Sequence, residues 1–181
     1  MIKLIIKHEG QVIEGAIPSG WPELKVKHFI GLNSKLSEIE LLSLLSDLDL
    51  SMLENTETDL SPFTEKLTAL FSEVPPDLKK LKRQKIKMLD KEIIFPSSIN
   101  FSRYGQKSMV KNLIQSNDHL EAIVPEVFAI YAQPIIDGKF DSTRIDAIKN
   151  EVNELPIMQV FPHVFFFFKK LKELKLLLLI K

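Results

Sequence analysis

The apolar C-terminal segment is the feature that most constrains the fold. Its large apolar residues recur at alternating spacings of three and four, as in a helix that packs along another helix: Ile157, Val160, Val164, Phe167, Leu171, Leu174 and Leu178. Phe165, Phe166 and Phe168 lie off this line, so this part of the helix would be apolar on every side and would need several neighbours. The sequence therefore predicts a long apolar C-terminal helix.

Three interpretations of this helix remain open. It is the central helix of the domain, or its end projects and buries its apolar surface in another subunit or a partner. The third is binding to a membrane surface, for which the lysines of this segment do not form a clean polar face. In the second case Phe167, Leu171, Leu174 and Leu178 form the candidate partner interface. We do not expect a membrane protein, because the uncharged run 155–168 has 14 residues and two prolines, whereas a bilayer span needs about 20 apolar residues.

Two β-hairpins are predicted, one near the start of each half of the chain. Residues 2–7 and 11–17 alternate or are β-branched and are joined through a turn that contains Gly10. Residues 84–89 and 92–95 form the second pair, around Asp90-Lys91, and Pro96 ends it.

Helices are predicted after each hairpin. In the first half, one can begin at Glu23, a second is marked by a capping box of Ser37 and Glu40, and a third by Ser61-Pro62. In the second half the predicted helices cover residues 102–115, 118–131 and 142–152, with a turn-rich connector at 133–139.

The two halves are similar in order. Ile17-Pro18-Ser19-Gly20-Trp21 and Phe95-Pro96-Ser97-Ser98-Ile99 match in residue type at an offset of 78, although five positions can also match by chance. We predict a single domain over 1–181 with two pseudo-repeated halves, about 1–78 and 79–181. The predicted fold class is α+β, predominantly helical, with two β-hairpins each followed by helices and the long apolar C-terminal helix.

Charge is distributed unevenly along a chain of net charge zero. Ten Asp or Glu and one Lys occupy residues 36–78, whereas six basic residues follow at once and form a candidate electrostatic patch: Lys79, Lys80, Lys82, Arg83, Lys85 and Lys87. This run is a solvated linker with a lysine-guarded edge strand, a contact for phosphates, or a complement to the acidic half. No aromatic residue is interleaved to stack bases, so we do not expect nucleic acid as the main partner.

Residue patterns for catalysis are missing from the sequence. The chain of 181 residues has no cysteine, which excludes disulfides and thiolate chemistry and fits a reducing cytoplasm. The glycines form no phosphate-binding loop, the four histidines have no metal-ligand spacing, and Glu38 and Glu40 do not share a helix face. We therefore predict a protein without catalytic residues, metal or cofactor, although an unfamiliar enzyme site built from distant residues remains an alternative.

Several short motifs resemble one family. They are Trp21-x-Glu23-Leu24 with Phe29-Ile30, Lys91-x-Ile93-x-Phe95-Pro96, the helix start Gly105-Gln106, and Leu155-Pro156 followed by Phe165 to Phe168. Together they resemble small virion-morphogenesis proteins of tailed phages and prophages of the Bacteroides and Flavobacterium type.

The resemblance implies a non-enzymatic role as a virion structural protein or a tail-assembly chaperone. Its partners would be further copies of itself or other phage structural proteins, in the host cytoplasm during assembly or within a virion. The alternative is an adaptor or regulatory protein that binds a partner or nucleic acid through its acidic and basic segments.

Overall fold

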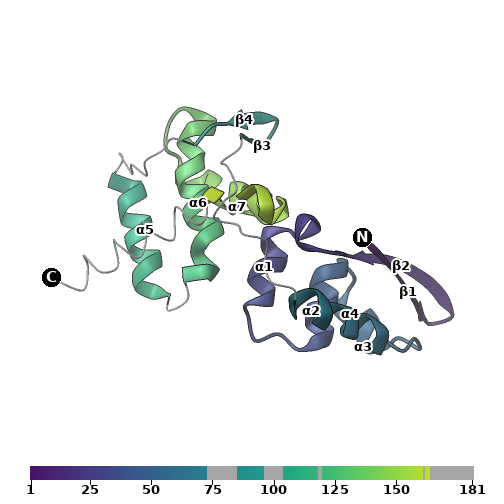
Figure 1. Ribbon diagram of the computed structural model, residues 1–181. Helices are drawn as coiled ribbons and strands as arrows, with labels where there is room; N and C mark the ends of the chain where they lie inside the picture. The colour runs from purple at the N-terminus through teal and green to yellow at the C-terminus, as the bar shows by residue number, and fades with distance from the viewer. Residues whose placement is uncertain (73–84, 96–103, 118–119, 161, 164–181) are drawn as a thin grey trace. The chain divides into compact units, whose positions relative to one another are not determined.

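The computed structural model describes residues 1–72, 85–95, 104–117, 120–160 and 162–163. The chain divides into two compact units, Met1–Asp77 and Leu78–Lys181, each with one hairpin and several helices (Figure 1). The predicted α+β class, rich in helix and with two antiparallel hairpins, is confirmed. The predicted C-terminal helix lies outside the described residues from position 164 onward, and the internal repeat stays a prediction.

The first unit begins with a regular hairpin. β1 (Ile2–His8) pairs with β2 (Gln11–Ile17) in antiparallel register from Ile2 opposite Ile17 to His8 opposite Gln11. The two turn residues, Glu9 and Gly10, have φ values of 50° and 73°, as a type I′ turn requires. Because side chains alternate along a strand, Leu4 and Ile6 are buried while Lys3, Ile5 and Lys7 are exposed.

A later loop forms hydrogen bonds with β1 on the edge that does not pair with β2. The Lys7 amide donates to Thr58 Oγ1 at 2.8 Å, and the Lys7 carbonyl accepts from the Glu57 amide at 2.9 Å and from Thr56 Oγ1 at 2.8 Å. These bonds join the segment before the last helix of this unit to the hairpin.

Five helical segments are described in the first unit: η1 (Trp21–Glu23), α1 (Val26–Leu32), α2 (Glu38–Ser46), α3 (Leu50–Glu54) and α4 (Ser61–Ser72). The α-helix predicted to begin at Glu23 begins at Val26, because the backbone of Leu24 is extended. The predicted capping box is present, since Glu40 accepts from the Ser37 amide at 2.7 Å and the Ser37 hydroxyl accepts from the Glu40 amide.

Helix α2 lies at the centre of this unit, in contact with β2, α1, α3 and α4. Its inward positions Leu42 and Leu45 are buried, as are Leu53 of α3 and Leu67 of α4. Helix α1 approaches it closely at Gly31, where an added Cβ would lie 2.0 Å from Leu44 Cδ2.

The second unit opens with a shorter hairpin. β3 (Ile86–Met88) pairs with β4 (Lys91–Ile93), and Ile86, Met88 and Ile93 are buried. Its turn is formed by Leu89 and Asp90, with φ values of 47° and 59°, one residue earlier than the predicted Asp90-Lys91. This turn therefore places two non-glycine residues in the left-handed region.

Four helical segments are described in the second unit: α5 (Tyr104–Ser116), α6 (Leu120–Asp137), η3 (Ser142–Arg144) and α7 (Ile145–Glu154). The predicted connector at 133–139 is wrong for its first part, because α6 continues through Pro125 and Pro134 to Asp137. Gly138, with φ of 77°, follows the last residue of α6.

A side chain from α5 explains why α6 tolerates Pro134. Proline has no amide hydrogen, so the carbonyl four residues earlier, that of Ile130, loses its helical donor. Gln106 Nε2 donates to this carbonyl at 3.0 Å, and both residues are buried. The neighbouring Gly105 permits a close approach, since a Cβ there would lie 2.8 Å from the Phe140 ring.

The turn after α6 is fixed by a second buried amide. The Gln133 side chain donates to Asp137 Oδ2 at 3.1 Å and to the Lys139 carbonyl at 3.0 Å, and it accepts from the Asp141 amide at 2.8 Å. Residues 137–139 thus form a helix end stabilised by hydrogen bonds.

An aromatic cluster covers the inner side of α6. Phe95, after β4, lies 4.5 Å from Phe128 and 6.0 Å from Tyr131 between ring centroids, and His163 lies 5.0 Å from Phe95. Phe128 is fully buried. The hairpin, α6 and the residues after α7 therefore share one core.

Replacing Gln106 by Leu should lower the free energy of unfolding by about 1–3 kcal/mol, because the buried Ile130 carbonyl then has no donor. Adding Pro134→Ala should recover part of the loss, since the new backbone amide at position 134 can reach that carbonyl. Urea unfolding of the two single variants and the double variant would measure a coupling of at least about 0.5 kcal/mol. Strictly additive effects would contradict this role of Gln106.

Exchanging residues between the two hairpin turns should change stability in opposite directions. Asp90→Gly should raise the free energy of unfolding by roughly 0.5–1 kcal/mol, because glycine adopts positive φ without steric cost, and Gly10→Asp should lower it by a similar amount. Thermal unfolding followed by circular dichroism would detect both shifts. If both substitutions raised the free energy of unfolding, or both lowered it, backbone conformation would not decide stability at these turns.

Candidate functional site

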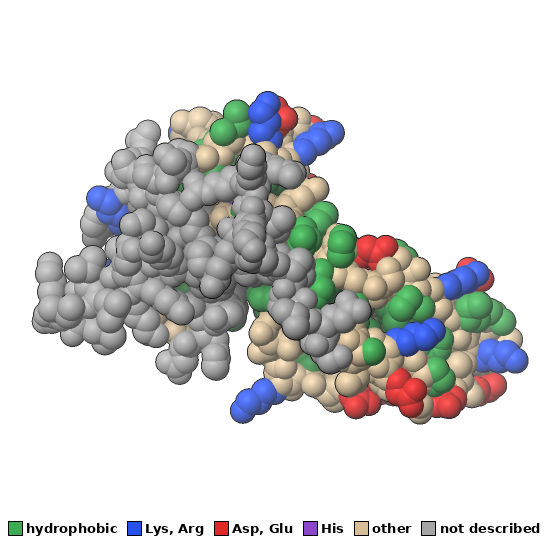
Figure 2. Space-filling view, in the orientation of Figure 1, with side chains coloured by type: hydrophobic (Ala, Val, Ile, Leu, Met, Phe, Trp, Pro, Cys, Tyr) green, Lys and Arg blue, Asp and Glu red, His purple; other side chains and the backbone are tan. Residues whose placement is uncertain are grey.

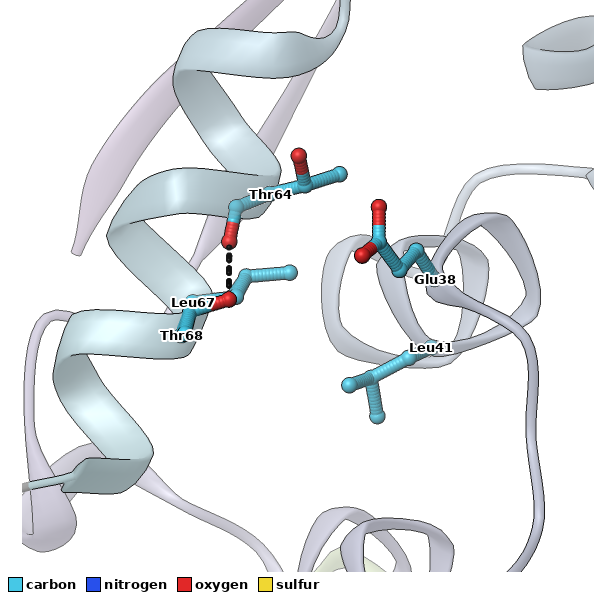
Figure 3. A pocket seen from close by; sticks show the side chains of 5 residues that line it. All are labelled: Glu38, Leu41, Thr64, Leu67 and Thr68. Atoms are coloured by element: carbon cyan, nitrogen blue, oxygen red, sulfur yellow. Dashed lines mark hydrogen bonds between the residues drawn. The ribbon is translucent and has the colours of Figure 1, made fainter.

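A small cavity lies between α2 and α4, and we call it the α2–α4 cavity (Figure 3). It has a volume of about 40 Å³ and is lined by Glu38, Leu41, Thr64, Leu67 and Thr68. Cavities that hold small-molecule ligands usually have about 300–1,000 Å³. This one can take a few water molecules or the end of a side chain.

Helical spacing brings the lining residues together. Glu38 and Leu41 are three positions apart on α2, and Thr64, Leu67 and Thr68 are three and four positions apart on α4, so each set shares one helix face. Leu67 is buried and Leu41 is half-buried, whereas Glu38 and Thr68 are exposed. The cavity therefore has apolar walls and a polar rim.

Both threonine hydroxyls of the lining donate to carbonyls of their own helix. The Thr68 hydroxyl donates to the Thr64 carbonyl at 3.0 Å (Figure 3). The Thr64 hydroxyl donates to the Ser61 carbonyl at 3.1 Å. Both oxygens keep acceptor capacity after their hydrogens are used. The Glu38 carboxylate, which points toward Thr64 in Figure 3, has no hydrogen-bond partner among the described residues.

Acidic residues are frequent in the sequence from α2 to α4. Eight exposed acidic residues fall between positions 38 and 65: Glu38, Glu40, Asp47, Asp49, Glu54, Glu57, Asp59 and Glu65. Figure 2 shows acidic side chains on the visible face of this unit. The unit Met1–Asp77 carries 13 acidic and 6 basic residues, and the unit Leu78–Lys181 carries 11 acidic and 18 basic residues.

Half of these acidic groups have structural partners. Hydrogen bonds from Ser37, Ser51 and Ser61 lower the pKa of Glu40, Asp49 and Asp59 respectively. Burial alone would raise the pKa of Asp47, but its hydrogen bond from Lys27 and the charge of Lys25 outweigh burial and lower it.

The other four acidic groups, Glu38, Glu54, Glu57 and Glu65, have no side-chain hydrogen bond or ion pair within the described ranges. These four carboxylates are thus the ones without a described partner, and of the four only Glu38 lines the α2–α4 cavity.

Most of the predicted electrostatic patch, namely Lys79, Lys80, Lys82 and Arg83, lies outside the described residues. Lys85 and Lys87 are described, and both are exposed beside or on β3. Lys85 Nζ lies 2.8 Å from Glu92 Oε2 on the neighbouring strand. An ion pair across the two strands is one way in which charged residues protect a small sheet.

The predicted partner interface of Phe167, Leu171, Leu174 and Leu178 also lies outside the described residues. The first two members of the same apolar line, Ile157 and Val160, are described and buried in the second unit. The line therefore begins in the core of that unit.

The histidines that the structure describes do not form a cluster. His8 Nδ1 lies 3.4 Å from the Asn55 carbonyl, and His28 and His163 are buried, while His119 lies outside the described residues. Among the residues that the structure describes, no group of three or more His, Asp or Glu side chains could hold a metal ion. Within the same ranges no helix combines the length and apolar character needed to cross a bilayer.

Sequence reasoning did not identify the α2–α4 cavity. Glu38 and Glu40 are an acidic pair in the sequence, but the structure gives them different roles: Glu40 completes the capping box, whereas Glu38 lines the cavity. The spacings of the lining residues along α2 and along α4 indicate that each set shares one helix face. The local sequence does not indicate that these two faces meet. That pairing depends on how the helices pack.

Comparison with known proteins gives no relative: no protein-family model, curated protein or solved structure matches this chain.

Proposed function

We propose that this chain is a non-enzymatic virion structural or assembly protein of tailed phages that acts through protein–protein contacts. It would work in the host cytoplasm during assembly or as part of a virion, beside further copies of itself or other phage structural proteins. The phage assignment rests on the sequence resemblance. The contact role rests on one observation, the apolar line that starts at Ile157 and Val160 and continues toward the C-terminus.

The length of this line supports the proposal. If residues 164–181 continue as a helix, they extend for about 27 Å at 1.5 Å per residue. Among the described helices only α6, with 18 residues, is as long, and one face of α6 already packs on α5 and α7. Phe167, Leu171, Leu174 and Leu178 would then bury part of their surface in a second chain.

Substitutions near the end of this apolar line should disrupt assembly and leave folding intact. Leu174→Asn with Leu178→Asn should convert an oligomer to a monomer that keeps its helical circular dichroism, because two apolar contacts along one line are lost. The matched control is Leu176→Asn with Leu179→Asn, which removes two leucines from the opposite side of the same predicted helix. Light scattering after size exclusion would give the mass of each.

Three outcomes would weigh against the proposal. A monomeric unmodified chain would exclude self-assembly. If both double variants dissociated to the same extent, the association would be a general hydrophobic one without a defined interface along the apolar line. Unfolding of the Leu174→Asn and Leu178→Asn variant would place this segment in the core and remove it as an interface.

A second function is favoured by the charge separation. An adaptor or regulatory protein could use the acidic first unit and the basic segment that follows it to bind a partner or nucleic acid. Such binding should weaken steeply between about 50 and 200 mM salt, because it depends on exposed charges. Assembly through the apolar line should change little over this range, so the salt dependence distinguishes the two functions.

A further inference from the structure

We propose that the free edge of β2 is a docking site for an extended segment of a partner protein, which joins the first hairpin as a third strand. The segment has a basic residue opposite Glu14 and apolar residues opposite Val12 and Ala16. This inference rests on the proposed role in protein contact, and it assigns a surface other than the apolar C-terminal line.

The register of the hairpin shows which backbone groups point outward. With a two-residue turn, the flanking residues His8 and Gln11 are hydrogen-bonded to each other, and every second pair along the strands is bonded in the same way. Residues of the intervening pairs direct their N–H and C=O groups away from the partner strand. These residues are Lys3, Ile5 and Lys7 on β1 and Val12, Glu14 and Ala16 on β2.

The two edges of the hairpin differ in their hydrogen bonds. On β1, the outward amide and carbonyl of Lys7 are bonded to residues 56–58. On β2, no residue of the described ranges bonds to the outward backbone groups of Val12, Glu14 or Ala16. Val12 and Glu14 are exposed, Ala16 is half-buried, and the hairpin extends away from the helices of its unit (Figure 1). A row of backbone donors and acceptors is therefore open along β2, and an extended chain is the ligand whose groups repeat at the same spacing.

Strand β2 lacks the features that normally protect an exposed edge. Lysine, proline and β-bulges commonly prevent a further strand from pairing. Strand β1 has Lys3 and Lys7 at its outward positions, whereas β2 contains no lysine or proline and its register has no bulge. On the outer face of the sheet Val12 is 62% exposed and Ile5 is 44% exposed. A third strand would therefore gain apolar contacts as well as hydrogen bonds.

Charge on the outer face favours a partner strand over a second copy of β2. If two copies paired so that Val12 lay opposite Ala16, each Glu14 would lie directly opposite its counterpart, and like charges in that position destabilise a sheet. A shift by two residues would keep the two carboxylates as diagonal neighbours. The ion pair of Glu14 with Lys3 is exposed, at 60% and 58% of the side chains, so the carboxylate stays accessible to a second cation. A basic residue opposite Glu14 therefore fits this edge.

The test is a titration of the full chain into the fluorescent peptide Thr-Val-Thr-Lys-Thr-Val-Thr, followed by anisotropy. Two N-methylated versions are the matched probes. Methylation of the valine and lysine amides, which face β2 in the proposed pairing, should weaken binding at least about tenfold, because three backbone hydrogen bonds are lost. Methylation of the three threonine amides between and before these residues should weaken it less than about twofold, because these amides face away from β2.

Substitutions in the protein test the side-chain contacts. Glu14→Lys should weaken binding of this peptide about two- to fivefold and strengthen binding of the peptide with glutamate in place of lysine by a similar factor. The matched control Glu57→Lys makes the same charge change in the loop at the closed edge, and at about 150 mM salt it should alter both affinities less than twofold. Val12→Pro should abolish binding and leave the circular dichroism unchanged, because proline removes an amide that β1 does not use.

Four results would overturn the inference. They are absence of peptide binding, equal loss of affinity with both N-methylated peptides, and equal effects of Glu14→Lys and Glu57→Lys, which would mean attraction to a diffuse acidic surface. The fourth is an unmodified dimer that Val12→Pro converts to a monomer, because the edge would then belong to a second copy.

The test is independent of the apolar C-terminal line. The Leu174→Asn and Leu178→Asn variant should bind the peptide like the unmodified chain. A monomeric chain that binds the peptide would contradict self-assembly through the apolar line and support this site, whereas an oligomer that binds no peptide would do the reverse.

Discussion

The hydrogen bond from Gln106 to the Ile130 carbonyl is the contact on which the second unit depends. It replaces the donor that Pro134 removes, and it does so inside the core, where an unpaired carbonyl would be costly. With that carbonyl satisfied, α6 continues to Asp137 and can present Phe128 and Tyr131 to one aromatic cluster. One bond thus links the docking of α5, the length of α6 and the packing around Phe95.

The first unit is organised differently, by local chemistry at the ends of its elements. A type I′ turn sets the register of the hairpin, and serine or aspartate caps begin α2 and α3. The close approach of Gly31 to Leu44 then brings α1 onto α2. Helix α2 contacts β2, α1, α3 and α4, and its Leu41 lines the cavity that remains between α2 and α4.

The two proposed functions differ in their physics. Contact through Leu174 and Leu178 would gain from burial of apolar surface, which salt hardly weakens. Binding through the acidic first unit and the basic segment that follows it would weaken as ions screen these charges.

The sequence by itself determined the elements whose causes are local: both hairpins, the capping box at Ser37, and the helix at Ser61. It placed the second turn one residue late, because Leu89 in a left-handed conformation is not what leucine prefers. It also ended α6 too early, because proline normally stops a helix and the compensating donor, Gln106, is distant in sequence. Only the tertiary structure decided that bond and the meeting of Glu38 with Thr64, since both arise from the packing of separate helices.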